Sequence, residues 1–158
     1  MKRIALFLLV LLAGYQAVQA DQVDVSIRFW DKAVYYADSP DQAIEVLVTV
    51  TNKGPNTYRF KLADERSFCM DFDVRSMNNR SLPFTEALKN KRISHRPLYF
   101  RDISLESMES YSFRENLRDY VEISESGSYV ITLKLYPDLY RPEDAQAPLG
   151  HANITGGR

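Results

Sequence analysis

Residues 43–51 read Ala-Ile-Glu-Val-Leu-Val-Thr-Val-Thr, and this stretch decides the fold class. Its branched apolar residues fall on every second position, which is typical of a β-strand with one buried face. Leu47 lies on the opposite face and predicts burial there too, as in a strand at the centre of a sheet. The turn residues Gly54 and Pro55 follow. We therefore expect a central strand that ends at a turn over residues 52–56.

The same alternation recurs along the chain. Ten Tyr and eight Phe add to the β-forming composition, since aromatic residues favour pleated, half-buried strands. Residues 76–97 lose the pattern and predict a long connection, with at most a short helix at 84–90. We expect an all-β fold, an antiparallel immunoglobulin-like β-sandwich of about seven to eight strands. The other expected strands lie at about 23–30, 57–62, 68–74, 103–105, 111–113 and 129–136.

Residues 1–20 have the form of a cleavable secretory signal peptide. Lys2 and Arg3 precede an uncharged apolar run, and Val18-Gln19-Ala20 gives a small-x-small cleavage site before Asp21. The run is short for a bilayer core, which needs roughly 20 apolar residues, and no cysteine lies near the site for acylation. We expect an extracytoplasmic protein, periplasmic or secreted, without a stable membrane anchor. The style of the leader is bacterial.

The remaining chain predicts one domain over residues 21–140 and a loop-like C-terminal segment over 141–158. That segment contains Pro142 and Pro148 and ends in Gly-Gly-Arg. The strand at 129–136 would then keep an open edge, and such edges recruit strands from other chains. We expect self-association or a partner at this edge. The alternative is that residues 149–155 form a short edge strand.

The charge balance argues against nucleic acid as a partner. Loss of Lys2 and Arg3 with the leader reduces Lys and Arg from 20 to 18, against 21 Asp and Glu, a net charge of about −3. Such a chain has no broad basic field. Cys69 is the single cysteine, so no intramolecular disulfide can form. The alternation over 68–74 places Cys69 opposite the apolar face, as a small strand residue or, alternatively, a reactive thiol.

No catalytic or metal-ligand pattern stands out. His95 and His151 are the only histidines, and neither has a second ligand at metal-site spacing. A Gly-x-Ser-x-Gly nucleophile elbow and a Gly-rich phosphate loop are both missing from the sequence. We therefore expect a protein that is not an enzyme, with no catalytic residues, no cofactor and no metal.

Two aromatic segments predict a binding surface. Tyr and Arg on Pro-stiffened loops are typical of interface hot spots. We expect contact with a protein partner or a surface glycan, although the rings could instead cap the ends of the sandwich. The basic cluster of residues 89–92 with Arg96 and Arg101 is expected to be solvated, with an acidic partner or a glycan phosphate as the alternative. The expected partner-binding residues are Tyr35, Tyr36, Tyr136, Tyr140 and Arg141.

Residues 125–131 read Glu-Ser-Gly-Ser-Tyr-Val-Ile. The glycine allows a tight turn, and Tyr129 then takes the first inward position of a late strand. In immunoglobulin-like sandwiches a tyrosine so placed turns its hydroxyl back onto the backbone of the preceding corner. We expect Tyr129 to be a core residue with this hydrogen bond. The alternative is an ordinary strand tyrosine.

The order of these elements resembles the bacterial intracellular-proteinase-inhibitor-type domains over residues 44–136. The resemblance implies an immunoglobulin-like β-sandwich and, as an alternative function, proteinase inhibition. Ser107-Met108 stands where the family has Pro-Gly, and the leader departs from an intracellular role. A small carbohydrate-active or redox-sensing protein is a further alternative. The matching stretches are Ile44–Asn52, Tyr58–Phe60, Phe72–Arg75, Ile103–Phe113 and Gly127–Tyr129.

Overall fold

The computed structural model describes residues 23–31, 42–136 and 150–156. Antiparallel strands dominate these residues, which confirms the expected all-β class. Most strand boundaries lie within a few residues of the predicted ones. The elements are β1 (Val23–Phe29), β2 (Glu45–Asn52), β3 (Tyr58–Ala63), η1 (Arg66–Phe68), β4 (Met70–Ser76), α2 (Glu86–Ile93), β5 (Phe100–Leu105), β6 (Ser110–Asn116), η2 (Leu117–Asp119), β7 (Tyr129–Leu135) and β8 (Gly150–Gly156).

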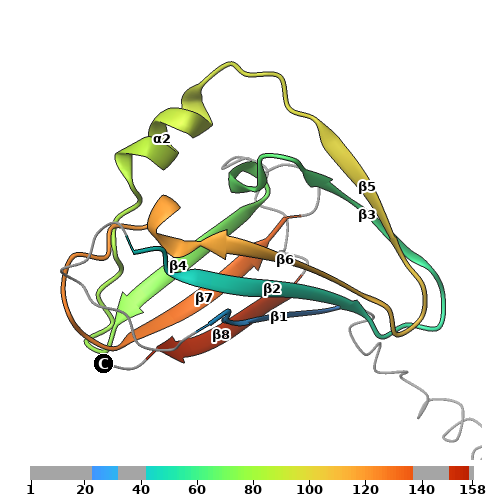
Figure 1. Ribbon diagram of the computed structural model, residues 1–158, viewed down its shortest axis with the longest axis horizontal. Coiled ribbons are helices and arrows are strands. Elements are labelled where there is room, and N and C mark those ends of the chain that lie inside the picture. Colours follow the sequence, from blue (N-terminus) through green and yellow to red (C-terminus); the bar gives the residue numbers. More distant parts are fainter. Residues whose placement is uncertain (1–22, 32–41, 137–149, 157–158) are drawn as a thin grey trace, which may run out of the picture.

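The strands form three hydrogen-bonded groups, in the orders β1-β2-β6, β3-β5 and β4-β7-β8 (Figure 1). β2 is the central strand of its sheet, as the apolar residues on both of its faces predicted. Val46, Val48 and Val50 are fully buried, whereas Leu47 on the other face is half-buried. Side chains from all three groups meet in one hydrophobic core.

β2 and β6 continue into β3 and β5, so that the two pairs make one long antiparallel ribbon. Thr51 pairs with Ser110 on one side of the junction, and Tyr58 pairs with Leu105 on the other. The ribbon bends at this junction, at the right-hand side of Figure 1, and β3 and β5 lead back toward α2. The bend therefore connects the β1-β2-β6 sheet to β3, which leads through η1 into β4 of the β4-β7-β8 sheet.

Asn52 holds the bend. Its amide nitrogen donates to the carbonyl oxygens of Asn56 at 2.7 Å, Leu105 at 2.9 Å and Glu106 at 3.2 Å. Its side-chain oxygen accepts from the backbone N–H of Gly54 at 2.9 Å. Asn52 is only 1% exposed, so water cannot replace these bonds. One buried amide thus satisfies the backbone of both chain segments at the corner.

The second chain segment at the corner makes a tight turn over residues 106–109. The backbone N–H of Glu109 donates to the carbonyl of Glu106 at 3.0 Å, and Met108 has a φ of 66°. A positive φ at the third turn position is the type II geometry, which favours glycine. Met108 therefore occupies a turn position that favours glycine, in a strained conformation.

The predicted place of Cys69 is wrong. Residues 66–68 form the 3-10 turn η1, so β4 begins only at Met70 and the two-residue alternation does not extend back to Cys69. Cys69 ends that turn and is fully buried in the core as a free thiol. The turn rotates the side chain inward, away from the outer face that a continuous strand would have given it.

The predicted loop-like C-terminal segment is also wrong for residues 150–156. β8 pairs along the whole of β7, from Tyr129 opposite Gly156 to Leu135 opposite Gly150. β7 is consequently a central strand between β4 and β8, and its expected open edge is covered by the chain's own backbone. Pairing through backbone groups needs no strong strand formers, so the weak local propensity was overridden. The basis for self-association at that edge is thereby removed.

The connection after β4 contains one helix, as the sequence allowed. The Thr85 hydroxyl accepts from the backbone N–H of Leu88 at 3.1 Å and caps the first turn of α2. Leu88 is the buried residue that holds the helix to the core. The helix begins at Glu86 and ends at Ile93, slightly later than the predicted 84–90.

Tyr129 makes the predicted corner bond. Its hydroxyl donates to the carbonyl oxygen of Glu125 at 2.6 Å. Its ring, however, is only partly buried against the core, because the preceding corner at residues 124–127 is exposed to solvent. Tyr129 is therefore not the full core residue that the sequence predicted, and its truncation should cost less than that of a fully buried aromatic.

We predict that Asn52→Ala destabilises the protein by about 3 kcal/mol, because it leaves buried carbonyl oxygens without donors. Thr51→Ala is the matched control. The Thr51 hydroxyl bonds that of Ser110 at 2.8 Å on the exposed face, so its loss should cost under about 1 kcal/mol. Urea unfolding of both variants measures the difference. Equal stability of the two variants would contradict the role of Asn52.

Candidate functional site

The structure tests little of the predicted partner-binding set. Tyr35, Tyr36, Tyr140 and Arg141 lie outside the described residues. Tyr136 follows β7, is partly buried, and donates its backbone N–H to the carbonyl oxygen of Cys69 at 2.7 Å. The set as a whole stays a prediction.

In the described ranges, no group of three or more His, Cys, Asp or Glu side chains could hold a metal ion. The same ranges contain no helix of the length and apolar character that crossing a membrane requires.

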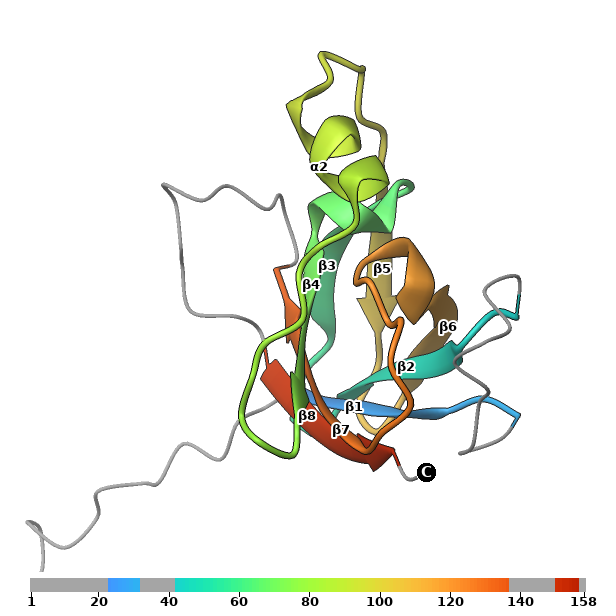
Figure 2. The same ribbon diagram turned by 90° about the vertical axis from the view of Figure 1, so that its left-hand side faces the viewer.

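A different surface stands out at residues 93–100, which run from the last residue of α2 to the first residue of β5. We call this segment the arm, and it projects from one end of the molecule (Figure 2). Three of its large apolar side chains are exposed, Ile93 by 74%, Tyr99 by 70% and Phe100 by 41%. Single exposed apolar residues are common, but several in one short segment mark a contact surface.

Arg92 anchors the helical end of the arm. Its Nε donates to the carbonyl oxygen of Ser67 at 3.0 Å, and its Nη2 donates to that of Met70 at 2.9 Å. Nη2 also lies 3.4 Å from the Asp71 carboxylate, and both side chains are only 14% exposed. The guanidinium further lies over the ring of Phe84, 5.5 Å from its centroid. α2 is thus fixed to η1 and β4.

Backbone pairing anchors the other end. The backbone N–H of Asp64 donates to the carbonyl oxygen of Tyr99 at 2.9 Å, and Phe100 pairs with Ala63 at the start of β5. The arm is therefore a short segment held at both ends. Its exposed side chains are presented by the fold and are not left on a free terminus.

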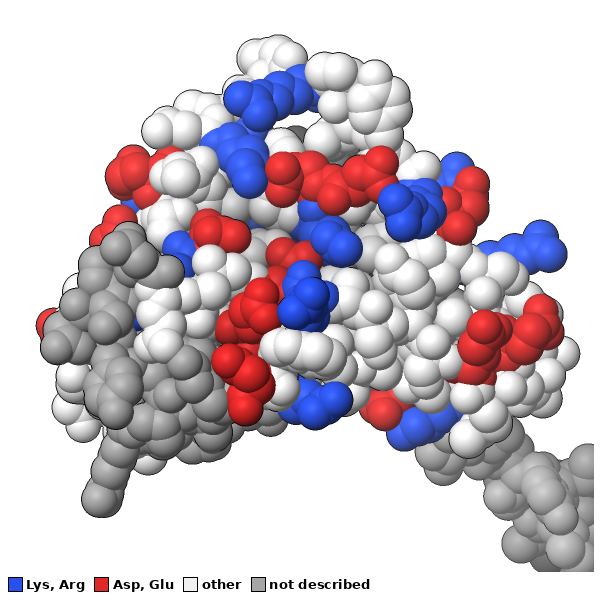
Figure 3. Space-filling view, viewed as in Figure 1, with Lys and Arg blue, Asp and Glu red and all other residues white. Residues whose placement is uncertain are grey.

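The basic cluster is less solvated than the sequence predicted. Lys89 lies 2.7 Å from Glu86, Lys91 lies 3.3 Å from Glu65, and Arg101 lies 3.4 Å from Asp64, in addition to the Arg92 pair. Figure 3 shows basic side chains near the top of the view, at the end of the molecule that carries α2 and the arm, above a row of acidic ones. The exposed pairs contribute little stability. The Arg92 side chain, however, is only 14% exposed, which contradicts the expectation of a solvated cluster.

Two carboxyl side chains, those of Asp71 and Glu115, are mostly shielded from solvent, with exposures of 14% and 12%. Burial raises the pKa of Asp71 above its usual range, and Arg92 offsets only part of this. Burial also raises the pKa of Glu115, although the Tyr120 hydroxyl donates to it at 2.9 Å and Arg66 lies 3.3 Å away. Tyr120 packs edge-on against Phe72, with ring centroids 4.8 Å apart. Glu115 thus contacts Tyr120 and Arg66, whereas Asp71 contacts Arg92.

Cys69 does not support the redox-sensing alternative. Burial raises the pKa of its thiol to about 11, and the thiol donates to the carbonyl oxygen of Arg66 at 3.3 Å. Reactive cysteines have a lowered pKa and solvent access. The thiol is therefore a packing group in this fold.

The sequence pattern did not indicate the arm as a binding surface. Ile93, Leu98, Tyr99 and Phe100 are apolar residues in a stretch without strand or helix periodicity. Several apolar residues within a predicted connection were the signal that could have indicated the arm. Such residues must either pack into the core or be exposed on the surface. Local sequence does not distinguish these outcomes.

We predict that the buried carboxyls weaken the fold as the pH rises. A folded carboxyl with a raised pKa holds its proton at pH values where the unfolded one has lost it, so stability falls with rising pH. The fall should begin at the ordinary values of 3.8 and 4.5. Glu115→Gln should flatten the dependence of the unfolding free energy on pH, measured by urea melts between pH 4 and 7. The exposed Glu86→Gln is the control, and parallel curves for all proteins would refute the assignment.

We also predict that native Cys69 resists alkylation. At pH 8, a pKa of about 11 leaves roughly one thiol in a thousand ionised. Iodoacetamide should modify the protein quickly in urea and very slowly without it, as followed by intact mass. Rapid modification of the folded protein would show that the thiol is accessible.

Two of the solved structures that are similar to this chain are β-glucuronidases. A Bacteroides uniformis β-glucuronidase is 12% identical, with a TM-score of 0.36, and the match covers 87% of this chain and 13% of that chain. B. uniformis β-glucuronidase 2, covalently bound to cyclophellitol-6-carboxylate aziridine, gives a TM-score of 0.37 at 12% identity with the same coverage. At these scores the likeness carries no argument about fold or activity. No curated protein matches the chain significantly.

A family model gives the informative match. The model described as flagellar collar protein C, N-terminal domain, covers residues 24–155. That range runs from β1 into β8, so it includes the bent ribbon, the arm and the core described above. The chain therefore belongs to the family of the flagellar collar protein C N-terminal domain.

Proposed function

We propose that this chain is an exported, non-enzymatic structural domain that binds another protein of a flagellar collar through the arm. Membership of the collar family supports the structural role. The observation that carries the binding surface is the exposure of Ile93, Tyr99 and Phe100 on a segment held at both ends.

The shape of the arm favours a protein as partner. Small-molecule sites are concave and enclose most of their ligand, whereas the arm projects outward. Aromatic residues and arginine are enriched at protein interfaces, and Arg96 lies exposed between the apolar residues. Since Arg92 and β5 already fix the arm, binding should cost little ordering entropy. A groove on a neighbouring subunit fits these properties.

The leader at residues 1–20 supports export, as the sequence predicted. An immunoglobulin-like sandwich is the architecture that we propose for the domain. The strand orders β1-β2-β6 and β4-β7-β8 and the corner bond of Tyr129 support it. A sandwich presents its connections at its ends, which suits a domain that joins other subunits.

We predict that Ile93→Ser with Tyr99→Ser abolishes capture of collar proteins by the tagged protein from an extracytoplasmic fraction. Loss of two hot-spot side chains should weaken binding at least about tenfold. Both residues are exposed, so the fold should persist. The matched control is Met77→Ser with Met108→Ser, which removes equally exposed apolar side chains elsewhere. Equal capture by both double variants would reject the arm as the binding surface.

One observation favours proteinase inhibition as a second function. The arm is a projecting segment fixed at both ends, the feature that an inhibitory loop requires, and the family resemblance of residues 44–136 implies the same activity. Inhibition assays with serine and cysteine proteinases separate the two functions. Collar binding alone predicts no inhibition, whereas an inhibitor would slow at least one proteinase and lose that effect on substitution of Arg96.

A further inference from the structure

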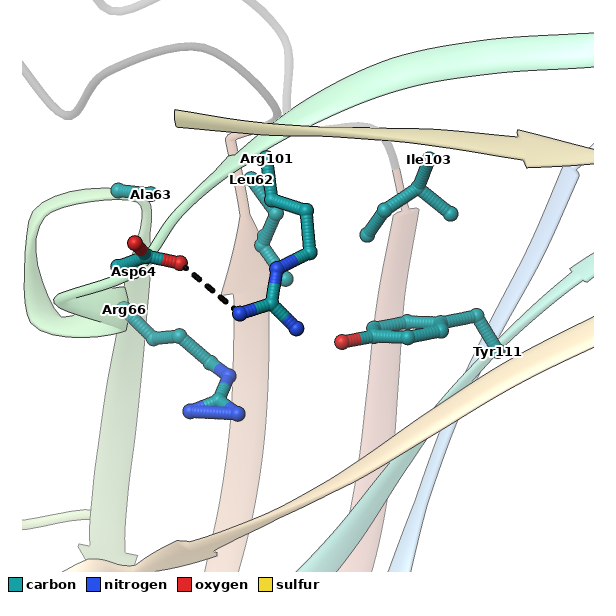
Figure 4. A pocket seen from close by; sticks show the side chains of 7 residues that line it. All are labelled: Leu62, Ala63, Asp64, Arg66, Arg101, Ile103 and Tyr111. Carbon is teal, nitrogen blue, oxygen red and sulfur yellow. Dashed lines mark hydrogen bonds and ion pairs between the residues drawn. The ribbon is translucent and has the colours of Figure 1, made fainter. Parts of the chain in front are cut away.

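A small pocket lies at the foot of the arm, between β3, β5 and β6. The guanidinium groups of Arg66 and Arg101 and the hydroxyl end of Tyr111 approach one another there (Figure 4). The side chains of Leu62 and Ile103 also line it, and its volume is about 60 Å³. Three groups that can donate hydrogen bonds thus face one small space beside apolar walls.

We propose that this pocket binds a side-chain carboxylate of the same partner protein that binds the arm. The inference rests on the proposed function and names the chemistry of the partner. Guanidinium groups bind planar carboxylates through paired N–H donors. A phenol hydroxyl can add a further donor. An aspartate or glutamate side chain of the partner supplies the matching acceptor.

The donors of the pocket are only partly used by the chain itself. Each guanidinium has five N–H donors. Arg101 forms an ion pair with Asp64 at 3.4 Å, and these side chains are 67% and 55% exposed. Arg66 lies 3.3 Å from Glu115, and its guanidinium lies 4.8 Å from the ring centroid of Phe113. A long, exposed pair contributes little, so a second carboxylate can compete with Asp64.

The pocket is small for a free cofactor or sugar. Its volume is about 60 Å³. Typical small-molecule sites are roughly 300–1,000 Å³. A group at the tip of a side chain therefore fits best. Arg101 directly follows Phe100 in β5, so a partner on the arm can reach the pocket.

The test is titration of the whole protein with acetate, followed by NMR of the arginine Nε–H groups. Saturable shifts are expected at Arg66 and Arg101. Asp64→Asn removes the competing carboxylate and should tighten acetate binding about two- to fivefold, the effect of losing an exposed ion pair. Arg101→Gln should weaken binding by at least about fivefold. Arg28→Gln, on β1 at the opposite edge of its sheet from β6, should change nothing.

Opposite effects of Asp64→Asn and Arg101→Gln, together with no effect of Arg28→Gln, support the proposal. A change of net charge alone would weaken acetate binding in Arg28→Gln as much as in Arg101→Gln. Unsaturable shifts, or equal shifts in all variants, overturn it. Tighter binding of inorganic phosphate than of acetate also overturns the carboxylate assignment.

Two readouts separate this inference from the proposed function. The arm variant Ile93→Ser with Tyr99→Ser leaves the pocket groups in place, so its acetate binding should be unchanged. If acetate binds as expected but no collar protein is captured by the parent, the proposed function fails while the anion site stands. If collar capture depends on the arm but is unaffected by Arg101→Gln, the pocket has no part in partner binding and the inference fails alone.

Discussion

The hydrogen bonds of the Asn52 amide are the constraint on which the rest of the fold depends. A ribbon as long as β2–β3 with β5–β6 could run straight and leave one end in solvent. It bends because one buried side chain satisfies three carbonyl oxygens and one N–H at the corner. In a low-dielectric interior such a group is costly when unpaired and specific when fully paired. The amide therefore selects this path for the ribbon over a straight one.

The bend also determines where the binding features lie. It directs β3 and β5 so that Ala63 and Phe100 pair at the root of the arm, while Arg92 fixes the other root through backbone carbonyls. Arg101 lies in the first residues of β5, so the pocket and the arm share one rigid support. A contact surface built this way needs little rearrangement on binding. Interior hydrogen bonds and surface recognition are thus parts of one arrangement.

Sequence pattern predicted the strands because alternation reports directly which face is buried, and Val46, Val48 and Val50 are buried as the pattern required. It failed where a non-local interaction decides the outcome. Cys69 is turned inward by a 3-10 turn that interrupts the alternation, and β8 forms because β7 offers a backbone template. The turn that begins at Asn52 was predicted correctly. The burial of the Asn52 side chain, however, depends on residues more than fifty positions away. The exposure of the arm likewise follows from its two anchors, which no local pattern contains.

The polar groups of the core and those at the foot of the arm differ in their exposure to solvent. Glu115, Tyr120 and Arg66 hold one another, and the raised pKa values of the first two follow from burial. Catalytic groups with perturbed pKa values are useful only where a substrate reaches them, and Tyr120 is 2% exposed. At the foot of the arm the polar groups are accessible instead, since the Arg101 side chain is 67% exposed. Its charge is then available to a partner, and the cost of desolvating it arises only when a matching carboxylate arrives. Selectivity for an acidic partner follows from that cost, because a neutral side chain in the same place would remove water from the guanidinium without replacing its hydrogen bonds.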